Sequence, residues 1–204
     1  MALDTFTGLK AEIGDWLNRA DLVAVIPTFI TLAEAGLNRT VRVRQMIKRA
    51  TATISQDFTS LPSDMLDAKN IQTNGQNGRS LEFVTLDRAD KIRRQTPTGE
   101  PLYYTIVGGT LELVPVPSGA TEVEITYYSK IPALSNTVAS NWLLASSPDL
   151  YLYASLLQSA PYLRDDPRIS TWGGIYSQLL ADLKLANERA EYSGSPLKAR
   201  GPLL

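Results

Sequence analysis

Two pairs of acidic residues are the positions where this chain could carry acid–base or metal chemistry. Asp165 and Asp166 are adjacent, and Glu122 and Glu124 alternate along a stretch of strand-like sequence. Paired carboxylates can share a proton or hold a divalent cation. We expect neither role, because Asp166 precedes Pro167 as a helix N-cap residue would, and alternating glutamates are typical of a solvated sheet face.

The residue types on which catalytic and metal sites are most often built are missing from the chain. Its 204 residues include no histidine and no cysteine. The commonest general base and the thiolate metal ligands are therefore absent, and disulfides are excluded. No phosphate-binding loop, dinucleotide-binding glycine pattern, zinc-protease motif or nucleophile elbow occurs. The sequence predicts a protein that is not an enzyme and that needs no cofactor or metal.

A basic run without any acidic residue spans residues 35–56. One interpretation is a solvated helix end, where cations favour the negative end of the helix dipole. The other is a contact patch for an acidic partner or for DNA passing nearby. The net charge of −1 argues against a dedicated nucleic-acid binder, so we expect only non-specific proximity to DNA. The candidate contact residues in this run are Arg39, Arg42, Arg44, Lys48 and Arg49.

Hydropathy gives no sign of a membrane segment. The longest apolar stretch without charge, residues 150–163, is shorter than the roughly 18 residues that a spanning helix needs. The first residues carry neither a basic region nor an apolar run, so no signal peptide is predicted. We therefore expect the protein to act without a membrane, in a reducing cytoplasm or in a particle assembled there.

Apolar residues at helical spacing predict helices at both ends of the chain. The first covers residues 6–19, and the second has Pro27 in its first turn. Either the second helix ends near Val43, or its C-terminal end packs against something other than its own core. Glu34 falls outside the apolar arc of this second helix, on its expected solvent side. Two C-terminal helices are predicted to follow Ser147 and Asp166, each of which precedes a proline.

Apolar residues at every second position predict strands in the middle of the chain. Short strands are expected at residues 50–55, 68–73 and 81–84, and a polar helix at residues 85–93. Residues 102–114 predict a hairpin that turns at Gly108-Gly109, with Val107 opposite Thr110. Residues 121–128 are expected to add a third strand to this hairpin and complete an antiparallel meander.

The order of these elements predicts an α+β fold. We expect a bundle of the N- and C-terminal helices (residues 1–49 and 141–192) with an inserted antiparallel β-sheet region (residues 50–140). Residues 193–204 lack periodicity and are predicted to form an extended arm. In the last helix Leu185 lies on the polar side, which makes it a candidate contact with a neighbouring molecule.

Several blocks of sequence resemble phage head–tail adaptor (connector) proteins. They occur in order over residues 9–195, and none is a catalytic motif. The blocks, with x at positions that do not contribute, are IPTFIxLAEAxLNR (26–39), VRVRQM (41–46), LPSDML (61–66), LELVP (111–115), YYxKIPAL (127–134), NWLL (141–144), PDLYLY (148–153) and APYLRDD (160–166).

This resemblance implies a structural virion protein in the neck of a tailed phage, assembled in the host cytoplasm. Such subunits form a ring, usually of twelve copies, between the portal protein and the tail nozzle or tail-tube protein, with DNA passing through the centre. Their C-terminal segments reach along the portal, so the resemblance makes residues 193–204 a docking arm. The candidate contact residues of this arm are Ser193, Pro196, Leu197, Lys198, Arg200, Leu203 and Leu204.

Two other functions are alternatives to the connector hypothesis. Another tail-completion or stopper component of the neck would have a similar helical body. A lytic or carbohydrate-acting enzyme would need two carboxylates facing each other across a cleft, and no credible pair is visible in the sequence.

Overall fold

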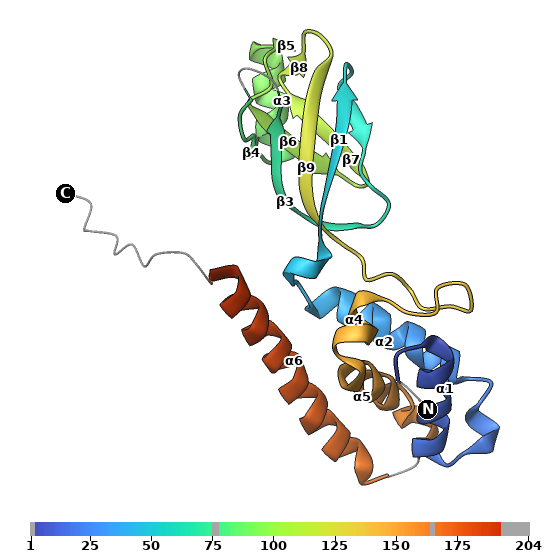
Figure 1. The fold of residues 1–204 in the computed structure, drawn as a ribbon. Coiled ribbons are helices and arrows are strands. Elements are labelled where there is room, and N and C mark those ends of the chain that lie inside the picture. The colour runs from blue at the N-terminus through green and yellow to red at the C-terminus, as the bar shows by residue number, and fades with distance from the viewer. Residues whose placement is uncertain (1–2, 75–77, 164–165, 193–204) are drawn as a thin grey trace. The chain divides into compact units, whose positions relative to one another are not determined.

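The computed structural model describes residues 3–74, 78–163 and 166–192 (Figure 1). Contacts within the chain divide it into two compact units. We call Met1–Gln45 with Ile131–Leu204 the helical unit, and Met46–Lys130 the strand unit. That the two units are separately folding domains stays a prediction.

The helical unit is built around a short central helix. Helix α5 packs against α1, α2 and α6, and six of its eleven residues are buried. Its own sequence is apolar on nearly every side, which suits a helix that is covered by several neighbours. The helices are α1 (Phe6–Leu17), α2 (Ile26–Thr40), α4 (Trp142–Ser146), α5 (Pro148–Gln158) and α6 (Arg168–Tyr192), with short 3₁₀ turns η1 (Ala20–Leu22), η2 (Arg44–Met46) and η3 (Ala160–Tyr162).

Local sequence sets the ends of these helices. The Thr5 hydroxyl accepts a hydrogen bond from the Gly8 amide at 3.1 Å and caps the start of α1. Asn18 ends α1 in a left-handed conformation, with φ of 50°. Pro27 lies in the first turn of α2, as predicted, but α2 ends at Thr40 because Val41 is extended.

The strand unit contains two larger sheets that share one apolar core. Ile71, Val123 and Ile125 from the first sheet pack against Leu111 and Leu113 from the second. The first sheet has the order β1-β9-β3 and the second β2-β7-β6-β4. The strands are β1 (Ile47–Ile54), β2 (Phe58–Ser60), β3 (Met65–Thr73), β4 (Glu82–Phe83), β5 (Thr98–Gly99), β6 (Tyr103–Val107), β7 (Thr110–Val114), β8 (Val116–Pro117) and β9 (Thr121–Ser129).

A helix covers part of the outer face of the second sheet. This helix, α3 (Leu86–Gln95), packs on β6 and β7. Val84, Ala89 and Val114 form a small buried cluster there. The strand unit is therefore layered as sheet, sheet and helix.

The predicted hairpin is confirmed, including its register. Strands β6 and β7 are antiparallel, with Val107 opposite Thr110 and Tyr104 opposite Leu113. Gly108 takes the left-handed conformation that the two-residue turn needs, with φ of 59°.

The predicted meander is wrong. Strand β9 pairs with β1 on one side and β3 on the other, and not with β7. The connecting residues instead form β8, which pairs with β5 in parallel. Proline cannot donate to a ladder, so the Pro-rich connection at residues 115–119 moves β9 out of the hairpin sheet.

The predicted fold class is also wrong. Instead of a helical bundle with one inserted antiparallel sheet, the described residues form a mixed fold of six α-helices and three sheets. Two of the strand pairings, β4–β6 and β5–β8, are parallel. Strands of two residues give no period-two signal, so their pairing depends on tertiary contacts alone.

Candidate interaction surfaces

The predicted basic cluster is divided between the two units. In the helical unit, Arg39 and Arg44 are exposed. The Arg42 guanidinium donates to the carbonyl oxygens of Asn38 at 2.7 Å and Val41 at 2.6 Å, so it satisfies the C-terminal end of α2. Arg42 therefore has the structural role of a helix-end cation, whereas Arg39 and Arg44 present charge to solvent.

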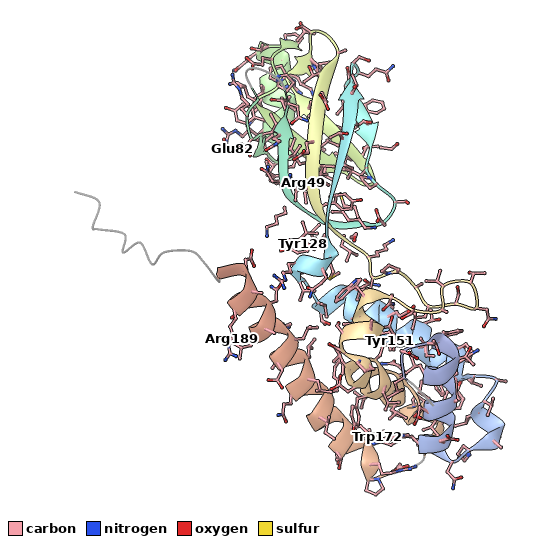
Figure 2. All side chains as sticks on the ribbon, viewed as in Figure 1. Arg49, Glu82, Tyr128, Tyr151, Trp172 and Arg189 are labelled. Atoms are coloured by element: carbon pink, nitrogen blue, oxygen red, sulfur yellow. The ribbon has the colours of Figure 1, made fainter. Side chains whose placement is uncertain are left out.

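The other two basic residues lie on β1 in the strand unit. Lys48 pairs with Asp64 at 2.7 Å. Arg49, which is labelled in Figure 2, lies 3.9 Å from Glu124. The hydrogen bonds from Lys48 and from the Tyr127 hydroxyl hold the pKa of Asp64 below its usual range, against the opposing effect of burial. The Arg49 side chain is 73% exposed, so its ion pair contributes little to stability.

Leu185 lies on the exposed side of α6, with 44% of its surface accessible. The apolar stripe on the opposite side of this helix is only half-covered, since Trp172 alone is buried among the described residues of α6. The stripe consists of Ile169, Trp172, Ile175, Tyr176, Leu179, Leu180, Leu183 and Ala186. Since α6 has 25 residues and α5 has 11, α5 can cover less than half of the stripe. The candidate arm residues Ser193, Pro196, Leu197, Lys198, Arg200, Leu203 and Leu204 lie outside the described residues.

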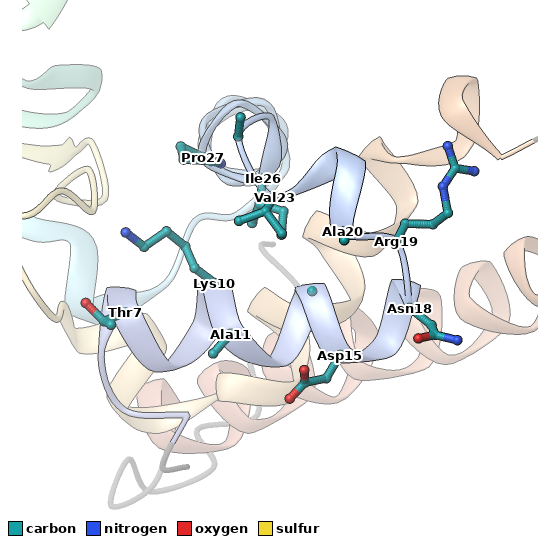
Figure 3. A pocket seen from close by; sticks show the side chains of 12 residues that line it. Thr7, Lys10, Ala11, Asp15, Asn18, Arg19, Ala20, Val23, Ile26 and Pro27 are labelled. Atoms are coloured by element: carbon teal, nitrogen blue, oxygen red, sulfur yellow. The ribbon is translucent and has the colours of Figure 1, made fainter.

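An open groove of about 730 Å³ lies between α1 and α2 (Figure 3). Small side chains form its surface, among them Ala11, Gly14 and Ala24. Lys10 and Arg19 lie toward opposite ends of the groove. Among the residues that line the groove, Asp15 is the one with an acidic side chain.

Glu34 is buried in the helical unit, with 5% of its surface exposed, although its helix position indicated solvent. Its Oε1 accepts hydrogen bonds from the Leu134 amide at 2.8 Å and from the Tyr151 hydroxyl at 2.7 Å. Tyr151 is labelled in Figure 2. Burial raises the pKa of Glu34, and these two hydrogen bonds partly offset that shift. Burial, together with the adjacent Glu34 carboxylate, also raises the pKa of Tyr151.

The same polar network reaches the start of α4. The Asn141 amide donates to the Pro132 carbonyl at 2.7 Å and to the Tyr151 hydroxyl at 2.9 Å, and its Oδ1 accepts from the Leu144 amide. The network therefore fixes the chain of residues 131–141 against α2 and α5. Every hydrogen bond in it is internal to the helical unit, so we assign it a structural role.

An apolar slot opens between β1 and β2 at the side of the strand unit. Its volume is about 240 Å³, and it reaches the buried core residues Leu111, Val123 and Ile125. Ala50 and Ala52 line it from β1, and Leu61 lines it from beyond β2. The sequence signal for this slot is weak: two alanines stand at inward positions of β1 where larger aliphatic residues would close the core.

The structure describes three residues of the two acidic pairs: Glu122, Glu124 and Asp166. Glu122 is exposed and Glu124 half-buried on the outer face of the first sheet. Asp166 pairs with Arg168 at 2.7 Å, which holds the pKa of this carboxyl below its usual value. Asp165 lies outside the described residues.

Two further findings concern the described residues as a whole. They contain no group of three or more His, Cys, Asp and Glu side chains placed to hold a metal ion. None of their helices combines the length and the apolar character that crossing a bilayer requires.

Comparison with known proteins gives one family match. A comparison with curated proteins finds no match. A family model described as SU10 adaptor protein matches residues 4–200, which include both the helical and the strand unit. The chain therefore belongs to the SU10 adaptor protein family, a family of phage adaptor proteins.

Proposed function

We propose that this phage adaptor is a head-to-tail connector subunit. Copies of the chain form a closed ring, a dodecamer in the virion, between the portal protein and the tail nozzle or tail-tube protein. DNA passes through the central channel, and the subunit acts structurally, without catalysis. The observation that carries the proposal is the family match over residues 4–200.

The surfaces of the helical unit support assembly by contact. A ring of identical subunits uses heterologous interfaces, in which two different surfaces of each chain meet. The exposed Leu185, the half-covered stripe of α6 and the groove between α1 and α2 are features that an isolated subunit does not need. We assign Leu185 to such an interface.

The basic residues contribute to the same proposal in different ways. Arg39, Arg44 and Arg49 present exposed charge to neighbouring proteins or to DNA in the channel. Arg42 and Lys48 serve mainly internal contacts. Residues 193–204 act as an arm that contributes to assembly.

Electron microscopy of the full chain mixed with the purified portal protein tests the proposal. A closed ring of density on the portal is the expected result, and portal particles without added density would contradict it. A Leu185→Glu variant should assemble poorly, while Lys184→Glu, at the adjacent exposed position, should assemble as the parent does. Equal assembly of the two variants would remove Leu185 from the interface without affecting the ring.

A further inference from the structure

Strand β1 has a free edge without the usual protection against further pairing. Among the described strands, β1 lies at one side of its sheet and is hydrogen-bonded there to β9 alone. Edge strands are commonly protected by charges, prolines or bulges. Residues 50–54, Ala-Thr-Ala-Thr-Ile, contain neither a charge nor a proline. At the other side of the sheet, β3 is bulged and its end pairs with residues 79–81.

The inner face of the sheet is left uncovered next to this edge. Ala52 lies opposite Val123, which is 2% exposed, and yet Ala52 itself is exposed. Ala50 and Ala52 are too small to cover the core, and the apolar slot lies beside them. A free strand edge and an adjoining apolar slot are the two features that strand addition uses: backbone hydrogen bonds supply affinity, and pockets for alternate side chains supply specificity.

The size of the slot favours a protein side chain over a free small molecule. Its volume of about 240 Å³ lies below the roughly 300–1,000 Å³ typical of small-molecule sites. Its lining is mainly aliphatic, with Ile54, Leu61 and Leu111 among the contributors. One aliphatic side chain with a small residue two positions along a strand suits such a space.

The outer face beside β1 indicates which charge an added strand should carry. Thr51 and Thr53 point to this face, opposite Glu124 and Glu122 of β9. Neighbouring strands lie about 4.8 Å apart, so a long cationic side chain on an added strand can reach over a threonine toward these glutamates. The matching occupant alternates an aliphatic residue, facing inward, with a basic residue, facing outward.

One segment of this chain has that pattern. Leu197 and Ala199 alternate with Lys198 and Arg200, and Pro196 and Pro202 flank the stretch. Proline ends strand pairing, so the flanking prolines limit a paired strand to residues 197–201. This segment has the same number of residues as the free half of β1, residues 50–54. The twelve residues after Tyr192 reach at most about 40 Å when extended, which allows an arm to leave its own subunit.

We propose that residues 197–201 of a second copy add as a strand to the free edge of β1, with Leu197 in the apolar slot. Lys198 and Arg200 then face Glu122 and Glu124. The inference rests on the proposed function in one respect, that copies of the chain lie side by side, and it names the neighbouring subunit as the surface that the arm binds. Pairing of β1 with β1 of a second copy would not fill the slot, because the inward residues of the added strand would be the small Ala50 and Ala52.

Disulfide cross-linking between copies tests this arrangement, because the chain contains no cysteine of its own. Full-length Ala199→Cys is mixed with full-length Ala52→Cys, oxidised, and compared with Ala199→Cys mixed with Thr53→Cys. Position 52 faces inward and position 53 outward on the same exposed strand, so the geometry of a disulfide predicts about tenfold more cross-linked dimer for the 52–199 pair. Position 200 faces outward, so the preference should be the opposite there. Arg200→Cys should give more cross-linked dimer with Thr53→Cys than with Ala52→Cys.

A second variant separates the strand from the rest of the arm. Leu197→Asp, placed in the Ala199→Cys chain, should abolish the cross-link because it brings a charge into the slot. Leu204→Asp, beyond the flanking Pro202, should leave it unchanged.

Several results would overturn the inference. Absence of any cross-link between copies, or equal yields at positions 52 and 53, would each do so. A double variant with Ala52→Cys and Ala199→Cys in one chain is oxidised as well, and a cross-link that forms only within this chain would also overturn the inference. The same mixtures are examined after addition of the portal protein. Rings that form on the portal without the 52–199 cross-link would reject the strand while leaving the proposed function intact, and absence of both would reject the two together.

Discussion

At the scale of single residues, Glu34 is the position where helical periodicity fails. It follows the buried Ala33 directly and lies at the margin of the apolar arc of α2. A helical wheel places such a position on the solvent side of the helix. Residues 131–141 nevertheless return over α2 and cover Glu34. The carboxylate then receives the donors that this chain and Tyr151 would otherwise leave unpaired.

Substitution of Glu34 separates its hydrogen bonds from its charge. Glu34→Ala should lower the free energy of unfolding by about 1–3 kcal/mol, since two buried donors lose their acceptor. Glu34→Gln keeps an acceptor oxygen and removes the buried charge. The folded-state pKa of Glu34 is raised above the ordinary 4.5. Protonated Glu34 therefore stabilises the fold fully below pH 4.5, and this stabilisation is lost as pH rises through the folded-state pKa.

Urea unfolding over a pH series measures this effect. The stability of Glu34→Gln relative to the parent should rise as pH increases above 4.5, the ordinary glutamate value. Other carboxyls with lowered pKa values, such as Asp64, cancel in the difference between the two proteins. A difference independent of pH would show that the carboxylate does not titrate in this range.

The arginines differ in the same way, by what each one contacts. Arg42→Glu should lower the thermal midpoint, because the side chain that satisfies two carbonyls at the end of α2 is replaced by one that repels them. Arg49→Glu should leave the midpoint nearly unchanged and reduce assembly on the portal, since its side chain is 73% exposed. Calorimetry and sedimentation of the two variants side by side separate these effects. A large loss of stability in Arg49→Glu would contradict the assignment.

At the scale of elements, local signals fixed most helices and the hairpin. The turn of the hairpin shows how strong such a signal is. Gly108→Ala should destabilise the protein by about 1–2 kcal/mol, because φ of 59° forces a side chain into the left-handed region. Gly109→Ala is the matched control, since no atom lies within 4 Å of the added methyl group and its φ is not left-handed. Denaturant unfolding that shows equal losses for the two variants would contradict the turn geometry.

Pairing between elements followed other rules. Strand β9 has nine residues, against five in each strand of the hairpin, and carries apolar residues at every second position, which fits a meander as well as a central strand. Its actual partners, β1 and β3, lie more than 45 residues earlier in the chain. The meander was therefore the wrong one of two pairings that the sequence pattern allowed.

At the scale of the whole molecule, the strand unit has its two ends side by side. Ile47 at the start of β1 pairs with Tyr128 at the end of β9, about 5 Å away. We therefore predict that residues 46–130 fold alone and that the helical unit folds when a short flexible linker replaces them. Dispersed amide signals by NMR and cooperative unfolding of both products are the expected results. A molten product from either would show that the units depend on each other.

The arm should be separable from both units. Deletion of residues 193–204 is expected to leave the thermal midpoint and the circular dichroism spectrum unchanged, because the segment lacks the periodicity of a core element. The assembled fraction on the portal, measured by sedimentation, should fall severalfold. A loss of the folding transition in the truncated chain would instead make the segment part of the core.

The sequence by itself determined the elements that depend on neighbours along the chain. The amphipathic helices, the start of α2 at Pro27 and the register of the hairpin follow from local spacing, since side-chain period and turn chemistry need no distant partner. The absence of histidine and cysteine and the order of the adaptor-like blocks were equally visible, and the family match agrees with those blocks.

Only the tertiary structure decided which distant segments meet. It buried Glu34 beneath a returning chain, divided the basic run between two units, placed β9 between β1 and β3, and left the apolar slot open beside two alanines. Each of these outcomes depends on contacts between residues far apart in sequence. Periodicity states which face of an element is apolar, but it does not state what covers that face.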